Sequence, residues 1–173
     1  NKIMVVVDEG VDIHNTKEVA RYVSENTEPQ YDIVFSRGPM DVLDHSCSAF
    51  AFGGKMGIDA TKKSPEEMAG RTPPFSPQSM TPFPEKEELV RLFPEIKNVN
   101  ASLLQKNISL VILSVQKTRK GHIRELNEKL FAHEGFKHLK VVLYLDHTVN
   151  IESIADAVWR FANNVDPERD RFL

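Results

Sequence analysis

The stretch from Arg37 to Lys63 carries the residue types with which a protein most readily does chemistry. It holds four glycines, an Asp-His-Ser run at positions 44–46 and three lysines within 27 residues. No helical or strand period runs through it, and it contains too many aliphatic and aromatic side chains for a disordered segment. We therefore expect residues 37–63 to form an ordered loop that contacts a ligand or another part of the protein.

The Gly-Gly-Lys run at 53–55 is the first candidate site in this loop, because glycine amides and a lysine can cradle a phosphate. A Walker loop also requires a glycine before this run and a Ser or Thr after the lysine. Those places hold Ala49 and Met56, which excludes a Walker loop. A weaker anion site at Lys55 and a simple glycine-enabled turn both stay open, and the local sequence favours the turn.

The run Asp44, His45, Ser46 and Cys47 is the second candidate. Members of a Ser-His-Asp triad must converge in space, whereas neighbours in sequence usually point apart. Cys47 is the single cysteine of the chain and has no evident activating partner, which is typical of an inert, small apolar residue. The run predicts no nucleophilic catalysis.

Acidic residues follow the first predicted strand. Asp8, Glu9 and Asp12 would lie at the carboxyl end of a parallel strand, where open α/β sheets bind ligands, and they could hold a cation. The second half of the chain keeps an acid only at the counterpart of Asp8, so a turn that maintains the fold is the stronger interpretation. No spacing of His and Cys residues suggests zinc.

Composition limits the class of protein. The chain has 173 residues, of which 40% are hydrophobic and 27% charged, and a formal net charge of -3. Such values are typical of a soluble globular domain and give no electrostatic reason to expect nucleic acid as a partner. One cysteine excludes an internal disulfide, and neither a transmembrane run nor a signal peptide is evident. We expect a cytoplasmic protein, of which this chain is one piece.

The elements that would position these residues alternate between strands and helices. This order predicts a single α/β domain over residues 1–173, with a mostly parallel sheet flanked by helices. Six prolines between residues 64 and 84 indicate an extended connector. The predicted strands are 3–7, 32–35, 108–115 and 139–145, and the predicted helices begin at the cap Asn15 and at residues 85, 119 and 154.

The last segment of the chain repeats the first. Residues 2–35 align with 140–173 at a constant offset of 138 and share identical residues at seven positions, among them Asp8 with Asp146 and Pro29 with Pro167. Two unrelated strand-helix units with similar caps are the alternative, and internal duplication is the better explanation. Only the first copy continues into the glycine-rich stretch, which points to a role in function for that stretch.

The quoted residues also resemble a known family. The series KIMVVVDEGVDI, EPQYDIVFSRGPMDVLDHS and FGGKMGIDATKK is similar to the C-terminal domain of the UbiD-type decarboxylases, over Lys2 to Lys63. The second copy is similar again through SVQKTRKGH and AVWRFANNVDPERD. It lacks the glycine-rich part, and the first copy departs from the DPxRD motif of the family at Glu28, Gln30 and Tyr31.

The resemblance implies a carboxy-lyase that acts, as the full-length protein, on 3-polyprenyl-4-hydroxybenzoate or a related aromatic acid in ubiquinone or menaquinone biosynthesis. It implies prenylated FMN and a divalent metal, Mn or Mg, both held by upstream domains, so that this fragment alone would be inactive. It also implies a homo-oligomer and no catalytic residue or metal ligand within this chain.

Within the chain, the resemblance and the position of the residues mark two groups. The substrate-proximal candidates are Phe35, Leu43, Asp44, His45 and Ser46, and the expected loop anchor consists of Gly53, Gly54 and Lys55. A non-catalytic oligomerisation or assembly module is the main alternative. A self-sufficient mononucleotide-binding enzyme is a weaker alternative, because no complete nucleotide fingerprint is present.

Overall fold

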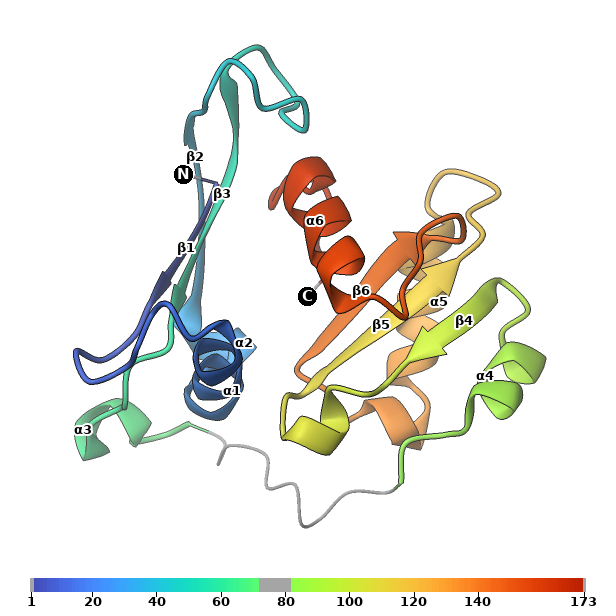
Figure 1. Cartoon of the computed structure of the whole chain (residues 1–173), viewed down its shortest axis with the longest axis horizontal. Helices are drawn as coiled ribbons and strands as arrows, with labels where there is room; N and C mark the ends of the chain where they lie inside the picture. The colour runs from blue at the N-terminus through green and yellow to red at the C-terminus, as the bar shows by residue number, and fades with distance from the viewer. Residues whose placement is uncertain (1, 72–81, 173) are drawn as a thin grey trace. The chain divides into compact units, whose positions relative to one another are not determined.

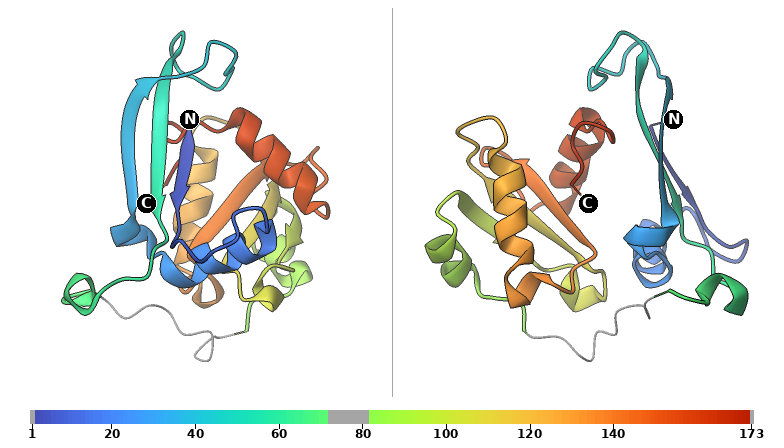
Figure 2. Two further views of the ribbon diagram at one scale, coloured as in Figure 1. Left: turned by 60° about the vertical axis from the view of Figure 1, so that its left-hand side comes forward. Right: turned by 180° about the vertical axis from the view of Figure 1, so that it is seen from behind.

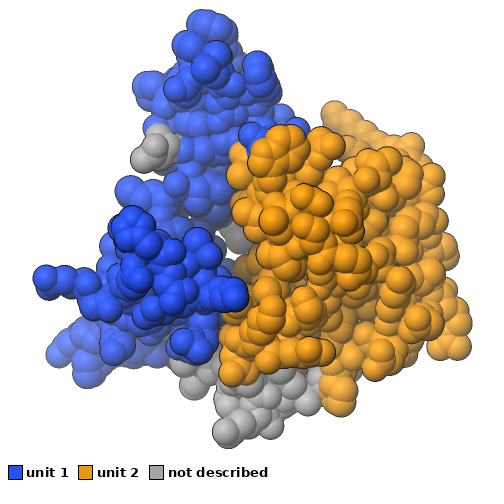
Figure 3. Space-filling view, viewed as in Figure 1, with its two compact units in different colours: residues 1–74, 163–171, 173 blue, residues 75–162, 172 orange. Residues whose placement is uncertain are grey.

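The computed structural model describes residues 2–71 and 82–172, which form two compact units (Figures 1 and 3). The described residues of unit 1 are 2–71 and 163–171, and those of unit 2 are 82–162 and 172. Each unit is built on a three-stranded sheet of its own. The single domain predicted over 1–173 stays a prediction.

Unit 1 contains a sheet in the order β1-β3-β2. β1 and β3 are parallel, and β2 and β3 form an antiparallel hairpin, with a loop at its end (Figure 1). The elements of this unit are β1 (Ile3–Val6), α1 (Thr16–Asn26), α2 (Pro29–Asp32), β2 (Ile33–Pro39), β3 (Phe52–Asp59) and α3 (Pro65–Met68).

The expectation of one long loop over 37–63 is wrong at both ends. β2 continues to Pro39, and β3 pairs with it from Phe52 onward, so residues 40–51 connect the two strands. Glycines at 53, 54 and 57 conceal β3 in the sequence, because they contribute no alternating side chains while their backbone groups still pair.

Unit 2 contains a sheet in the order β4-β5-β6, with β5 at its centre. α5 and α6 lie on opposite faces of this sheet (Figures 1 and 2). The elements are α4 (Lys86–Leu92), β4 (Ile96–Asn100), η2 (Leu104–Lys106), β5 (Leu110–Val115), α5 (His122–Phe131), η3 (Glu134–Phe136), β6 (Val141–Asp146) and α6 (Ile154–Asn164).

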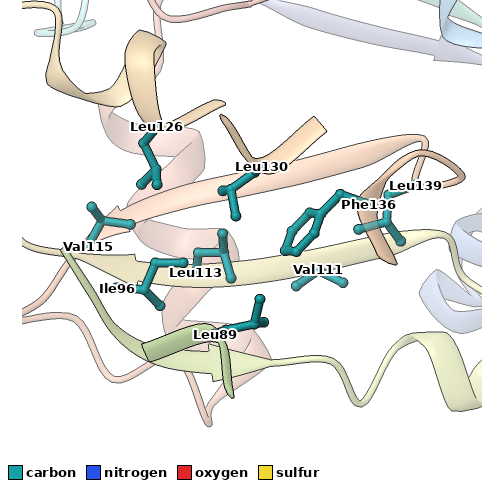
Figure 4. Close-up of a cluster of buried hydrophobic side chains, with 9 residues drawn as sticks. All are labelled: Leu89, Ile96, Val111, Leu113, Val115, Leu126, Leu130, Phe136 and Leu139. Atoms are coloured by element: carbon teal, nitrogen blue, oxygen red, sulfur yellow. The ribbon is translucent and has the colours of Figure 1, made fainter. Parts of the chain in front are cut away.

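The hydrophobic core lies in unit 2. Alternate residues of β5 point to the two faces, so Val111, Leu113 and Val115 join Leu126 and Leu130 of α5 in one buried cluster (Figure 4). On the other face Ile112 packs with residues of the segment that leads into α6. Among the described residues of unit 1, the only buried apolar side chains are those of Ala60 and Pro167.

The prediction of a mostly parallel sheet is wrong, although the α/β class is confirmed. Each sheet joins one parallel pair to one antiparallel pair. The antiparallel pairs arise from β3 and β4, the two strands that the sequence conceals. β4 reads IKNVN, with too few apolar residues to stand out as a buried strand.

The connector predicted over 64–84 contains a short helix, α3, which begins with a capping box between Ser64 and Glu67. This contradicts an entirely extended segment over residues 65–68. A capping box satisfies backbone donors at the helix start, so it favours a helical turn despite the neighbouring prolines. Residues 72–81 of the connector lie outside the described residues.

The two predicted copies share hydrogen bonds at the offset of 138. This agreement supports an internal strand-helix repeat, although its origin by duplication stays a prediction. The matched bonds are Val11 N to Asp8 O with Val149 N to Asp146 O, Val19 N to Asn15 O with Ala157 N to Ser153 O, Glu18 N to Asn15 Oδ1 with Asp156 N to Ser153 Oγ, and Glu28 N to Asp32 Oδ2 with Asp166 N to Asp170 Oδ2.

Candidate functional site

The loop at the end of the hairpin is held by a charged network. Lys2 Nζ lies 3.1 Å from Asp44 Oδ2 and donates a hydrogen bond of 2.7 Å to Ser46 Oγ. Ser46 in turn donates to Asp44 Oδ1 through its hydroxyl, at 2.6 Å, and through its backbone N–H, at 2.9 Å. The start of β1 thereby fixes the conformation of the loop around residues 44–46.

This network explains what the Asp-His-Ser run does. Burial alone would raise the pKa of the Asp44 carboxyl, but the hydrogen bonds from Ser46 and Lys2 hold that pKa below its usual value. A carboxylate with a lowered pKa is a poor general base, and the Ser46 hydroxyl already donates to it. No hydrogen bond joins His45 to either residue in the described chain. Asp44 and Ser46 thus shape the loop.

Two of the substrate-proximal candidates lie on the outside of the same loop. Leu43 is 75% exposed, and His45 is exposed beside it. Val42 and Phe50 add further exposed apolar side chains to residues 40–51, which we name the hairpin tip. An apolar, exposed tip is a feature of segments that contact another molecule or domain.

Phe35 does not join this group. It lies on β2 opposite Met56, and the guanidinium of Arg171 stands over its ring at 3.6 Å from the centroid. Such a cation–π contact fixes the ring against the C-terminal segment. The structure therefore separates Phe35 from the four candidates at positions 43–46.

The expected loop anchor lies within a strand. Gly53 and Gly54 belong to β3, and the C-terminal segment passes directly over them. A Cβ atom at Gly54 would lie 2.4 Å from Asp166 Oδ1 and 2.5 Å from the backbone nitrogen of Glu168. Only glycine permits that approach. Lys55 lays its side chain across Gly38 of β2, with its Cε 3.1 Å from where a Cβ would stand.

The segment 166–171, which we name the C-terminal clasp, makes further contacts with the hairpin. Glu168 forms an ion pair of 2.8 Å with Arg37, and Arg169 donates to the carbonyl of Ser46 at 3.1 Å. Sequence reasoning missed this clasp as part of the site. The signal that could have found it is the pair Gly53–Gly54, since adjacent glycines within a strand indicate the close approach of another backbone.

Asp166 is the centre of the clasp and is 2% exposed. Its Oδ1 accepts from the N–H of Glu168 at 2.9 Å. Burial alone would raise the pKa of this carboxyl, but the N–H groups of Glu168, Arg169 and Gly54, with the Arg169 guanidinium, hold the pKa below its usual value. The contact therefore depends on an ionised carboxylate.

Asp8, the first of the acidic residues after β1, is engaged in the fold. Asp8 accepts hydrogen bonds from the hydroxyl of Tyr22 and from the N–H of Lys62, and the first of these raises the pKa of Tyr22 to about 12. Lys63 is buried and donates to the carbonyls of Asp59 and Thr61. These bonds fix the segment after β3 against the start of the chain.

The described residues of this chain include no cluster of metal ligands, and the cavity that they form in unit 2 is small for a flavin. A cavity in unit 2 has a volume of about 220 Å³ and is lined by Thr148, Val149, Asn150, Asp156, Trp159 and Arg160. Pockets that bind small molecules or cofactors usually have larger volumes, about 300–1,000 Å³. Within residues 2–71 and 82–172, no three His, Cys, Asp or Glu side chains gather as metal ligands. No helix in the same ranges is long and apolar enough to cross a membrane.

Most of the chain matches the model of a known protein family. Residues 1–60 and 79–173 match the family described as the 3-octaprenyl-4-hydroxybenzoate carboxy-lyase C-terminal domain. The match is interrupted between residues 61 and 78, a range that includes much of the proline-rich connector.

Individual relatives are considerably longer than this chain. An uncharacterized protein of Helicobacter pylori strain J99 is 30% identical over 95% of the chain, which spans 25% of that relative. Among solved structures, the UbiD-class enzyme HmfF from Pelotomaculum thermopropionicum, in complex with FMN, is 34% identical, covers 41% of this chain and 16% of its own, and has a TM-score of 0.34. The closed form of vanillic acid decarboxylase from Sedimentibacter hydroxybenzoicus is 30% identical, covers 55% and 19%, and has a TM-score of 0.37.

Replacing Gly54 by alanine should separate the clasp from the hairpin. The added methyl group would collide with backbone at Glu168, so we expect Gly54→Ala to lower the free energy of unfolding by about 1–3 kcal/mol. Gly57→Ala is the matched control in the same strand, because the nearest atom to its Cβ would be 4.0 Å away. Urea unfolding of the two variants measures the difference, and equal effects would contradict the close approach.

Acid should weaken the clasp. The lowered pKa of Asp166 means that its contribution is complete above the pKa of about 3.9 of an unfolded aspartate, and is lost as the pH falls through the folded value. We expect the free energy of unfolding to fall less steeply below pH 4 in Asp166→Asn than in the wild type. Identical pH profiles would show that Asp166 is not ionised in the clasp.

Proposed function

The chain belongs to the 3-octaprenyl-4-hydroxybenzoate carboxy-lyase C-terminal domain family, and from this premise we propose that the full-length protein is a UbiD-type decarboxylase. Its proposed substrate is 3-polyprenyl-4-hydroxybenzoate or a related aromatic acid, and its proposed pathway is quinone biosynthesis in the cytoplasm. The observation that carries the proposal is the family match, which includes the hairpin, its tip and the clasp.

The proposed reaction needs a flavin cofactor, which we place outside this chain. We assign prenylated FMN and its divalent metal to the remainder of the full-length protein. In the Helicobacter relative, about three quarters of the length lies outside the part that matches this chain. The cofactor would supply the electron sink for loss of carbon dioxide. The fragment of 173 residues alone is therefore proposed to be inactive.

The contribution of this chain is to hold the hairpin tip in a fixed shape. Leu43 and His45 are exposed on the tip and are proposed to face the aromatic substrate. Asp44 and Ser46 are proposed to act by positioning them, since their polar groups already bind one another and Lys2. Phe35 is proposed to contribute from β2.

The proposed loop anchor keeps its place in this account. Gly53 and Gly54 admit the clasp, and Lys55 covers Gly38. All three lie in the strand pairs of the hairpin next to the tip and are proposed to limit the motion of the tip. A small displacement of a positioned group is costly for catalysis, which is why rigid strands are useful next to an exposed tip.

A second candidate function is a non-catalytic assembly module of a homo-oligomer. The exposed apolar side chains of the tip, Val42, Leu43 and Phe50, favour this alternative, because they would also suit a protein interface. The two functions differ in what a tip mutation changes: catalytic constants in the first and oligomeric state in the second.

The full-length protein, prepared with prenylated FMN, tests the proposal. We expect release of carbon dioxide from 3-polyprenyl-4-hydroxybenzoate or a shorter-chain analogue. We expect Leu43→Ala to lower kcat/KM by about tenfold, since loss of one apolar contact removes about 1–2 kcal/mol. Val42→Ala removes an exposed residue of the same tip that is not assigned to the substrate, and should retain activity.

One outcome would decide against the decarboxylase, and another would decide against the role of the tip in catalysis. Absence of carbon dioxide release with each aromatic acid tried would remove the main proposal. Light scattering could instead show that Leu43→Ala loses its oligomers while kcat/KM is unchanged. That result would assign the tip to assembly and not to catalysis.

A further inference from the structure

β1 uses only one of its two edges. The N–H of Met56 donates to the carbonyl of Lys2, and the N–H of Ala60 donates to the carbonyl of Val6, both at 2.9 Å. In a parallel ladder alternate residues bond to the same neighbour, so the backbone groups of Ile3 and Val5 point the other way. No strand of the described chain pairs with that second edge.

β6, the counterpart of β1 at the offset of 138, uses the opposite edge. The N–H of Val141 donates to Ser109 O, and the N–H of His147 donates to Val115 O, both at 3.1 Å. Subtracting 138 from 141 gives 3, so β6 bonds to β5 through the position that corresponds to Ile3. The edge that is free in β1 is therefore the edge that β6 offers to β5.

One face of β1 is uncovered in the same way. Met4 is 58% exposed and Val6 is 45% exposed, although both are apolar. Their counterparts, Val142 and Tyr144, pack against the core cluster that contains Leu126 of α5. Within the described chain, β1 thus has no strand at its second edge and no helix over Met4 and Val6, whereas in unit 2 these places belong to β5 and α5.

We propose that a strand and helix built like β5 and α5, from the part of the full-length protein that precedes residue 1, complete unit 1. The strand pairs in parallel with the free edge of β1, and the helix covers Met4 and Val6. The sheet then reads new strand, β1, β3, β2. The free edge and the uncovered face of β1 are thus the binding surface, and the preceding strand and helix are the partner that binds there.

Two observations favour this occupant over a second copy of the chain. The β5 of another copy already has neighbours on both edges, β4 and β6, and cannot serve. Parallel strands need a crossover helix between them, so the natural supplier is the segment that leads directly into β1. The Helicobacter relative, of which this chain spans 25%, has ample length for such a segment.

Hydrogen exchange of the full-length protein at single-residue resolution tests the edge. We expect the amides of Ile3, Val5 and Val7 to exchange about as slowly as those of Val141 and Leu143, within roughly tenfold. Exchange of these three amides as fast as that of exposed loop amides would overturn the proposal. Protection that disappears when the protein is diluted to monomers would also overturn it, because the occupant would then be a second copy.

Cysteine labelling of the full-length protein tests the covered face, in a Cys47→Ser background. We expect a thiol-reactive probe to modify Met4→Cys at least about tenfold more slowly than Ala20→Cys, which places the thiol on the exposed side of α1. Equal rates for the two variants would show that no helix covers β1. Folding of each variant is checked by its circular dichroism spectrum before labelling.

Discussion

The close approach of the C-terminal clasp to β3 is the contact on which unit 1 depends. Two adjacent positions of the strand, Gly53 and Gly54, have no side chain, and the backbone at Glu168 occupies that space. Asp166 is buried there as an ion and receives backbone N–H groups in place of water. This one arrangement joins residues 163–171 to a hairpin more than 100 positions earlier in the chain. It is needed because unit 1 has almost no apolar core, so polar contacts and backbone pairing carry much of its order.

Several polar residues that look catalytic in the sequence have the same structural task. At four places where the sequence reads Asp or Asn, any residue, Ser or Thr, the hydroxyl and the backbone N–H of the third residue both bind the first side chain; these places begin at Asp44, Asp59, Asn100 and Asp146. Such side chains close turns by replacing a backbone partner. The Asp-His-Ser run is one member of this group. Its exposed histidine and the neighbouring leucine are the side chains of the tip that we propose to face another molecule.

Strong apolar periodicity made much of the fold predictable. The strands around Val111 and Leu143, the cap at Asn15 and the matching segments at the offset of 138 follow directly from residue type and spacing. β3 and β4 were not predictable in this way, because glycines and polar residues hide their alternation. The prediction of a mostly parallel sheet was wrong for the same reason, because β3 and β4 form the antiparallel pairs. The glycine pair at 53–54 signals that another backbone approaches β3, but local pattern could not identify the clasp as that backbone, since a contact between Gly54 and Asp166 appears only after the chain has folded. The assignment of residues 43–46 to a substrate stays a prediction that rests on family resemblance.

We propose that this chain supplies a rigid hairpin to a decarboxylase whose flavin is bound elsewhere in the protein. An experimental structure of the full-length protein with its cofactor tests this claim most directly. We expect residues outside 1–173 to hold the flavin phosphate and ring, the hairpin tip to be the part of this chain nearest the substrate, and Asp166 to lie against Gly54. A flavin held by residues of this chain, or a tip directed into solvent with the clasp detached from β3, would contradict it.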